Sequence, residues 1–553
     1  MSLQTTSNQE IPLQTVEVAR AAFPKGHPYI TLRDELGTLY SDEDFVKLFS
    51  KRGQPAISPW RLALITLMQF RENLSDRQAA EAVRARIDWK YLLGLELSDP
   101  GFNFSVLCEF RMRLIVGSAE QQLLELLLDK CRTHGLIKAR GQQRTDSTHV
   151  LMAVRELKRL ELIGETLRAA LNEISKKEPQ WLKSVSLPSW YDHYTKRIED
   201  SRLPRSEKAR SQYAQMMGED GFRLLAWIDT PSAPKALGKL MSIRALRTAC
   251  IRHYEVVPNS ERGARIRFKT DKEVTQATEE IVSPYDLDAR YRSKRGKHWV
   301  GYMVHLSESC DDETVHLITH VKTTPANRHD IESTESIHQA MAEKELLPAQ
   351  HFVDSAYISA ELLVNSKINY GIALVGPPRG NTSWQKQVKG AYTREQFLIN
   401  WQQRTVHCPQ GLKSISWNDR FIKGKLYHKV SFSKTACAVC KERRRCTQAK
   451  ETARRLRLLP QIQHETLQIA RQLSDSREWR RTYARRWGIE GTLSQGIRAF
   501  GLRQARYRGL VKTQLQNLAT AAAINIQRLI AWLHQQPREV KRISRFAQLA
   551  VAT

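Results

Sequence analysis

Three acidic residues stand in sequence settings that suit chemistry on a phosphate group. Asp146 lies in QQRTDSTH and Asp354 in HFVDSAY, each with an apolar or β-branched residue before it and a serine after it. Glu490 is the only acid in residues 479–509, a stretch that also holds eight arginines. Carboxylate oxygens are preferred ligands of Mg²⁺, and two such ions suit in-line displacement at phosphorus. The three acids therefore predict a site for two Mg²⁺ (or Mn²⁺) ions beside a polyanion.

Each of these acids also has a simpler interpretation. A lone aspartate is often a turn or cap residue, and Glu490 can form an ion pair with Arg486 one helical turn away. His149 is interpreted as a structural neighbour of Asp146, because a metal ion can activate water without a side-chain base. Other acids near the proposed core rank below the three: Asp286, Asp288 and Asp330.

The charge of the chain indicates which partners to expect. It carries 87 Lys and Arg against 58 Asp and Glu, a net charge of +29, and residues 441–553 hold 24 basic against 7 acidic residues. Concentrated arginine indicates binding to DNA phosphates, with an anionic membrane surface as the competing interpretation. Residues 515–533 are apolar but contain Asn, Gln and Arg, which favours a buried helix over a membrane span. We expect no membrane partner, no signal peptide and a cytoplasmic location.

Helical and strand patterns suggest how these residues are positioned. Residues 56–135 show apolar residues at helical spacing and a capping pair, Ser75 with Gln78; such a bundle is either a DNA-binding module or a packing domain. Strands are expected at 144–154, 299–306, 313–324, 351–357 and 370–377, and helices at 153–176, 331–346 and beyond 461. Residues 177–280 appear helical and charged, without a strand signal. The order predicts an α/β fold with a mixed sheet.

The cysteines give a separate signal. Cys437, Cys440 and Cys446 follow a Cys-x2-Cys-x5-Cys pattern, and Cys408 precedes them in HCPQG. Four thiolates fit a structural tetrahedral Zn²⁺ site, in which His407 can replace Cys408. A redox role for the CxxC pair is weaker, because no βαβ pattern surrounds it. Four unligated cysteines remain an alternative.

A basic stretch, ARYRSKRGKHW at 289–299, interleaves Tyr291 and Trp299 with five basic residues that include Arg295 and Lys297. We interpret it as a loop before a strand. Charge and aromatic rings together suit contact with a nucleic-acid backbone and base stacking. A solvated basic loop is the alternative.

The combined pattern resembles the RNase H-like DDE transposases of bacterial insertion sequences. The resemblance covers nearly the whole chain, through PAISPWRLALITLMQFRENLSDRQAAEAVR, RTDSTHV, SPYDLDARY, GYMVHL, VDSAY and RWGIEGTLSQGIRAFGLRQARYRGL. It implies that Asp146, Asp354 and Glu490 form the catalytic, metal-binding triad. It also implies an N-terminal helical domain that binds terminal inverted repeats, cleavage and strand transfer on double-stranded DNA, and a homodimer on that DNA.

Many such enzymes carry a Tyr-x2-Arg-x3-Glu-x6-Lys signature whose basic and tyrosine side chains contact phosphates. Tyr483, Arg486 and Glu490 match this spacing, but Ile497 occupies the lysine position and Arg498 follows it. Because Arg and Lys differ in geometry, hairpin formation is not carried over. The expected DNA contacts are Tyr483, Arg486, Arg498, Arg503, Arg506, Arg508, Arg295 and Lys297.

The resulting domain hypothesis has six parts. They are an N-terminal segment 1–55, a helical DNA-binding domain 56–135, core strands in 136–152 and 284–380, a helical insertion 153–283, a Cys-bearing insertion 381–460 and a basic helical part 461–553. Two rivals remain open: an inactive relative that only binds DNA, and a structure-specific nuclease that never joins strands.

Overall fold

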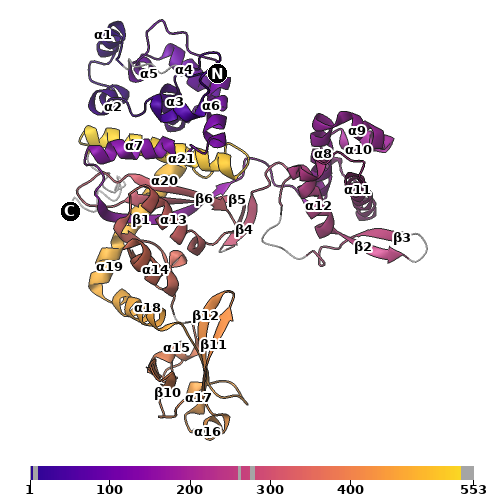
Figure 1. Ribbon diagram of the computed structural model, residues 1–553, viewed down its shortest axis with the longest axis vertical. Coiled ribbons are helices and arrows are strands. Elements are labelled where there is room, and N and C mark those ends of the chain that lie inside the picture. Colours follow the sequence, from indigo (N-terminus) through magenta and orange to yellow (C-terminus); the bar gives the residue numbers. More distant parts are fainter. Residues whose placement is uncertain are drawn as a thin grey trace, which may run out of the picture.

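The computed structural model describes residues 2–3, 10–259, 263–274, 281–294, 296–380 and 382–536. Its long axis runs from a group of N-terminal helices, through a central sheet, to a small Cys-bearing unit at the opposite end (Figure 1). A second helical unit projects sideways from the sheet. The elements that carry the predicted acids all lie in or beside the central sheet.

The central sheet is mixed and has six strands: β1 Arg140–Leu151, β4 Arg290–Lys294, β5 Lys297–Ser309, β6 Ile318–Pro325, β7 Pro348–Phe352 and β8 Ala373–Val375. Its order is β4-β5-β1-β7-β8, and β6 also pairs with β5. β5 is antiparallel to β1, β4 and β6, whereas β7 is parallel to both β1 and β8. This mixed α/β architecture confirms the predicted fold class and is consistent with an RNase H-like core.

Each of the five expected core strands has a counterpart, but the ends differ. β6 begins at Ile318, five residues after the expected start, and β7 ends at Phe352, so Asp354 follows its strand. The expectation of a loop at 289–299 is wrong, because residues 290–294 pair with residues 297–301 as the antiparallel strands β4 and β5. Gly296, with φ 76°, lies between them. This basic hairpin lies at the edge of the sheet, where no apolar alternation is needed.

Seven α-helices of the described part of the chain precede the sheet and lie at one end of the molecule: α1 Leu13–Ala22, α2 Pro28–Leu36, α3 Pro59–Arg71, α4 Asp76–Ala85, α5 Ile87–Leu93, α6 Ser105–Val116 and α7 Gln122–Thr133. Ser75 and Gln78 form the expected capping box at the start of α4. Trp60, Trp89 and Phe110 are fully buried, in one hydrophobic core that also includes Val304 of β5. These helices and the sheet therefore share a continuous core.

The long helix α21, Leu510–Leu533, is buried between the N-terminal helices and β6, as its sequence predicts. Its polar residues are paired with the edge of β6. The side chain of Asn525 accepts from the Ile318 N–H at 2.7 Å and donates to the Ile318 carbonyl at 2.8 Å. Gln514 does the same for the Thr323 N–H and the Val321 carbonyl. These amides satisfy backbone groups that an edge strand leaves unpaired.

Residues 153–259, 263–274 and 281–283 belong to the unit that projects from the sheet. It contains α8 Arg159–Lys177, α9 Pro179–Val185, α10 Pro188–Tyr194, α11 Glu207–Ile228, α12 Met241–His253 and the hairpin β2 Tyr254–Asn259 with β3 Gly263–Phe268. Trp190, Met217 and Leu246 belong to its own hydrophobic core. The expectation of no strand in this region is wrong, since β2 and β3 pair over six residues each. Val256 and Val257 of β2 are exposed, so this hairpin lacks the alternation of buried and exposed residues from which a strand is predicted.

The Cys-bearing unit is built from short elements: α15 Trp384–Gln387, β9 Leu398–Asn400, β10 Thr405–His407, β11 Ser416–Ile422, β12 Lys425–Ser431, α16 Lys434–Ala438, α17 Arg443–Cys446 and β13 Arg455–Leu458. β11, β12 and β13 form an antiparallel sheet. Phe397, Val430 and Leu458 lie in a small separate core.

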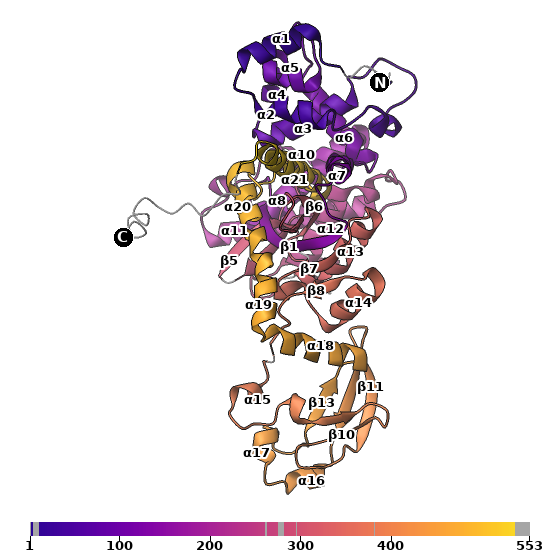
Figure 2. The same ribbon diagram turned by 90° about the vertical axis from the view of Figure 1, so that its left-hand side faces the viewer.

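The chain then returns to the central sheet through α18 Gln461–Ser474, α19 Arg477–Tyr483 and α20 Gly488–Phe500. These helices and α21 confirm the helices expected beyond 461 as far as residue 536, and residues 537–553 lie outside the described residues. The helices α13 Thr334–Glu343 and α14 Ala360–Tyr370 flank the neighbouring strands. Figure 2 shows α19 and α20 on one side of the strands and α14 on the other. Gly501, with φ 61°, ends α20 in the left-handed conformation that favours glycine.

Candidate active site

The central strand β1 carries Asp146 on the face that the C-terminal helices cover. Alternate residues of a strand share a face, and three alternate residues of β1 all contact that C-terminal segment. Arg144 donates to the Arg485 carbonyl, Asp146 pairs with Arg486, and Arg503 donates to the Thr148 hydroxyl. The Asp146 side chain is 16% exposed, at the margin between the buried sheet and solvent.

Asp354 lies beside Asp146 because β7 is the parallel neighbour of β1. It follows β7 by two residues and caps the short 3-10 helix Ser355–Tyr357, accepting from the Ala356 N–H at 2.7 Å. Side-chain contacts that link β1 to β7 hold the two aspartates at this spacing. Thr145 of β1 contacts the His351 ring of β7 at 2.6 Å, and His351 contacts the His338 ring at 2.8 Å.

Glu490 reaches the same place from the first turn of α20. This helix buries Ile489, Leu493 and Phe500 at helical spacing, which leaves Glu490 at the edge of the contact with its side chain 63% exposed. Arg486 joins the two elements. Its Nη2 lies 2.6 Å from Asp146 Oδ2 and its Nη1 lies 2.8 Å from Glu490 Oε1. The predicted ion pair between Arg486 and Glu490 is therefore present, and Arg486 also pairs with Asp146 of β1.

The carboxylates influence one another electrostatically. Burial raises the pKa of Asp146 to about 6; Arg486 and the Ser147 N–H oppose this shift, and the charges of Asp354 and Asp330 add to it. Asp330 is buried and accepts from the Ser147 hydroxyl at 3.2 Å, so it belongs to the surroundings of the site. Burial and like charge both disfavour the anion, so the cluster favours a cation.

Tyr483 and Arg486 lie next to the carboxylates, as the signature spacing predicts. The Tyr483 hydroxyl donates to the Val353 carbonyl at 3.2 Å, one residue before Asp354. Its ring stacks on Trp479, with centroids 4.7 Å apart. Burial raises the pKa of Tyr483 to about 12.

The other predicted DNA contacts are spread around the site. Arg498 is exposed on α20 and Lys297 is exposed at the start of β5. Arg508 lies over the Tyr285 ring at 5.6 Å. Arg506 instead turns toward the N-terminal helices, donating to the Leu74 carbonyl and lying over the Phe70 ring. Arg295 lies outside the described residues.

Asp286 and Asp288, which rank below the three acids, and His149 each contact a residue of the surrounding fold. Asp286 accepts from the Tyr302 hydroxyl, and Asp288 accepts from the Leu510 N–H at the start of α21. The His149 ring lies 5.3 Å from the Trp299 ring, consistent with the structural role expected for it.

A buried ionic cluster, not predicted from the sequence, positions α20. Glu308 of β5 is fully buried and its Oε1 pairs with Arg144 Nε at 2.6 Å. Its Oε2 accepts from Arg528 of α21 at 2.8 Å and from the Thr492 hydroxyl at 2.5 Å. Burial would raise the pKa of Glu308, but the two arginines hold that pKa below its usual value. A sequence feature that could have indicated this cluster is the run of three polar residues, Ser307, Glu308 and Ser309, at the end of an apolar strand.

The four cysteines of the predicted zinc site line one cavity of about 340 Å³ in the Cys-bearing unit. Burial raises the pKa of the Cys446 thiol, and the charges of Cys437, Cys408 and Cys440 add to this shift. His407 lies in β10 and does not line the cavity. All four side chains thus gather in one place.

The donor types at both places fit the predicted metals, carboxylate oxygens for Mg²⁺ or Mn²⁺ and thiolates for Zn²⁺. Within the described parts of the chain, however, no three His, Cys, Asp or Glu side chains are already grouped as a metal site. At the carboxylates, the guanidinium of Arg486 lies between two of the oxygen donors.

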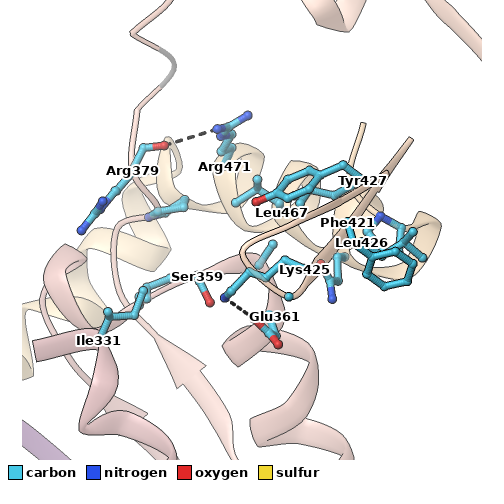
Figure 3. A pocket seen from close by; sticks show the side chains of 17 residues that line it. Ile331, Ser359, Glu361, Arg379, Phe421, Lys425, Leu426, Tyr427, Leu467 and Arg471 are labelled. Atoms are coloured by element: carbon cyan, nitrogen blue, oxygen red, sulfur yellow. Dashed lines mark hydrogen bonds and ion pairs between the residues drawn. The ribbon is translucent and has the colours of Figure 1, made fainter. Parts of the chain in front are cut away.

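A hollow of about 410 Å³ lies where the Cys-bearing unit meets α14 and α18 (Figure 3). Lys425 of β12 pairs with Glu361 of α14 across it, and Arg471 donates to the Arg379 carbonyl. None of the three predicted catalytic acids lines it. Lys425 is exposed and Glu361 is half-buried, so solvent screens this pair and it contributes little stability.

A mixed sheet in this order, flanked by helices, is consistent with the RNase H-like class of folds. Residues 407–530 match the family model described as a transposase DDE domain, and residues 17–113 match a transposase domain, DUF772. These two matches cover separate parts of the chain, and both support its resemblance to the DDE transposases of insertion sequences. The first match includes Glu490 and the four cysteines.

No curated protein matches the chain. Among the helices that the structure describes, none combines the length and apolar character needed to cross a lipid bilayer.

The position of α20 can be tested at two glycines of that helix. A Cβ at Gly488 would clash with the Arg144 guanidinium, whereas a Cβ at Gly491 would meet open space. We expect Gly488→Ala to destabilise the protein by about 1–3 kcal/mol through overpacking. The matched change Gly491→Ala should be neutral or stabilise by about 0.5–1 kcal/mol. Thermal unfolding of both variants measures this, and equal stabilities would contradict the packing described for α20.

Proposed function

We propose that this chain is a transposase that binds the terminal inverted repeats of its insertion sequence, cleaves the DNA at their ends and joins those ends to target DNA. The observation that supports this most strongly is the pairing of Arg486 with both Asp146 and Glu490, with the charge of Asp354 close enough to act on the same guanidinium. Residues 340 positions apart in sequence are brought into direct contact there. Such convergence of like charges is costly unless a cation binds.

In this proposal Asp146, Asp354 and Glu490 hold two Mg²⁺ or Mn²⁺ ions. When bound, these ions supply activation of the attacking oxygen and neutralisation of charge at phosphorus. Asp146 lies on β1 and Asp354 follows β7, and contacts of Glu308 and His351 hold these strands in place. The spacing of the two aspartates is therefore set before DNA binds.

The basic side chains around the carboxylates position the DNA backbone. Tyr483 and Arg486 flank the carboxylates, and exposed Arg498 and Lys297 extend the positive surface. Arg508 and Arg503 lie along the segment that follows α20. Contacts of this kind set the register of the duplex and depend on salt. The N-terminal helices bind the inverted repeats, and two copies of the chain assemble on the paired ends.

Replacing Glu490 by Gln preserves its shape and removes its charge. We expect Glu490→Gln to abolish Mg²⁺-dependent cleavage of DNA carrying the flanking inverted repeats, with end binding within about threefold of wild type. Denaturing gels measure cleavage and fluorescence anisotropy measures binding. Loss of binding in parallel with cleavage would instead support a purely structural ion pair with Arg486.

Two other outcomes distinguish the rivals. Binding without cleavage by the wild-type protein would favour an inactive, regulatory relative. Cleavage without joined products, in a strand-transfer assay with precut ends and a target plasmid, would favour a nuclease that does not transpose. Joined products in that assay support the full proposal.

For the Cys-bearing unit we propose a structural Zn²⁺ held by Cys408, Cys437, Cys440 and Cys446. Their common cavity supports this, and so does the small size of the hydrophobic core around Phe397 and Val430. Small units of this kind are commonly stabilised by a metal ion.

We therefore expect about one zinc per purified chain by elemental analysis. Cys440→Ser should lower the zinc content at least fivefold and lower the unfolding temperature. Cys108, which is exposed and far from the cavity in sequence, provides the control: Cys108→Ser should retain the metal. A wild-type zinc content near zero would contradict the site.

A further inference from the structure

Arg486 occupies the centre of the carboxylate cluster. Its side chain is 11% exposed, and its guanidinium donates to Asp146 at 2.6 Å and to Glu490 at 2.8 Å. Asp354 also acts on it electrostatically. Its Nε is buried without a hydrogen-bond partner in the part of the chain that the structure describes. The side chain is therefore held by its two carboxylate contacts and not by a wider network.

This position matters because a buried carboxylate cluster needs positive charge. Asp146 is nearly buried and lies near the charges of Asp354 and Asp330. A single guanidinium supplies one positive charge and occupies two of the oxygen donors. A divalent cation supplies more charge and binds oxygens at shorter distances. Because the guanidinium lies against one oxygen of each carboxylate, a cation that binds both oxygens has to take the space that the guanidinium fills.

We propose that Arg486 substitutes for the divalent cation in the metal-free protein, and that its guanidinium is displaced from Asp146 and Glu490 when the cation binds. This inference rests on the proposed function in one respect, that these carboxylates bind the metal. It adds a positioning role: Arg486 keeps strand β1 and helix α20 aligned before metal binding, at a cost in metal affinity. The alternative is a permanent ion pair that stays in place when the metal binds.

The direct test is Mn²⁺ binding to the full chain without DNA, measured by isothermal titration calorimetry. We expect Arg486→Gln to bind Mn²⁺ at least fivefold more tightly than wild type, because no guanidinium has to leave. Arg486→Lys, which keeps the charge but cannot bridge two carboxylates in the same way, should lie between them. Arg481→Gln is the matched control, since it removes one charge from an exposed position on α19, and its affinity should stay within twofold.

A second measurement uses the wild-type protein and so does not depend on how the variants fold. Phenylglyoxal modifies accessible arginines, and mass spectrometry reports each site. Arg486 should be protected in metal-free protein and modified at least threefold faster with saturating Mn²⁺. The modification rate of Arg481 should not change.

The outcomes separate this inference from the proposed function. Unchanged or weaker Mn²⁺ binding by Arg486→Gln, or Arg486 protection that persists with Mn²⁺, would overturn the displacement while leaving the metal site intact. Mn²⁺ binding that Asp146→Asn leaves unaffected would overturn the metal site itself, and the inference with it. Tighter binding by Arg486→Gln that Asp146→Asn abolishes supports both.

Discussion

The buried carboxylate of Glu308 connects the parts of the protein on which the site depends. It joins Arg144 of β1 to Arg528 of α21 and to Thr492 of α20, with side-chain exposure close to zero. A buried charge of this kind is tolerated only when paired, and removal of one partner leaves the others uncompensated. Since Arg144 precedes Asp146 by two residues on the same face of β1, the cluster that fixes the helix also fixes Glu490 over the strand.

The carboxylate site itself combines two interpretations that appeared to compete. Glu490 is paired with Arg486 on one helical turn, as a simple ion pair predicts. The same guanidinium extends to Asp146, whose pKa burial raises to about 6. In the proposed account, the ion pair and the metal-bound site are two states of the same set of charges. In both, positive charge offsets carboxylates that the fold forces together.

The sequence indicated which acids lie near one another better than it indicated the contacts that hold them in place. Acids flanked by β-branched residues and serine, and the Tyr483, Arg486 and Glu490 spacing, indicated residues that the fold brings together. The hairpins β2–β3 and β4–β5 were missed because exposed strands need no apolar alternation. The Glu308 cluster was missed because pairing between residues far apart in sequence leaves no local pattern. For Arg506, positive charge suggested DNA, whereas its contacts are with the N-terminal helices.

The most direct test of the central claim, that Asp146, Asp354 and Glu490 form one metal-dependent DNA-cleaving site, is to locate Mn²⁺ by anomalous X-ray scattering. The crystals would contain the full chain bound to an inverted-repeat end. We expect manganese peaks within about 2.5 Å of oxygens from all three side chains. Peaks elsewhere, or an Arg486 guanidinium still between Asp146 and Glu490 with no metal beside them, would contradict the claim.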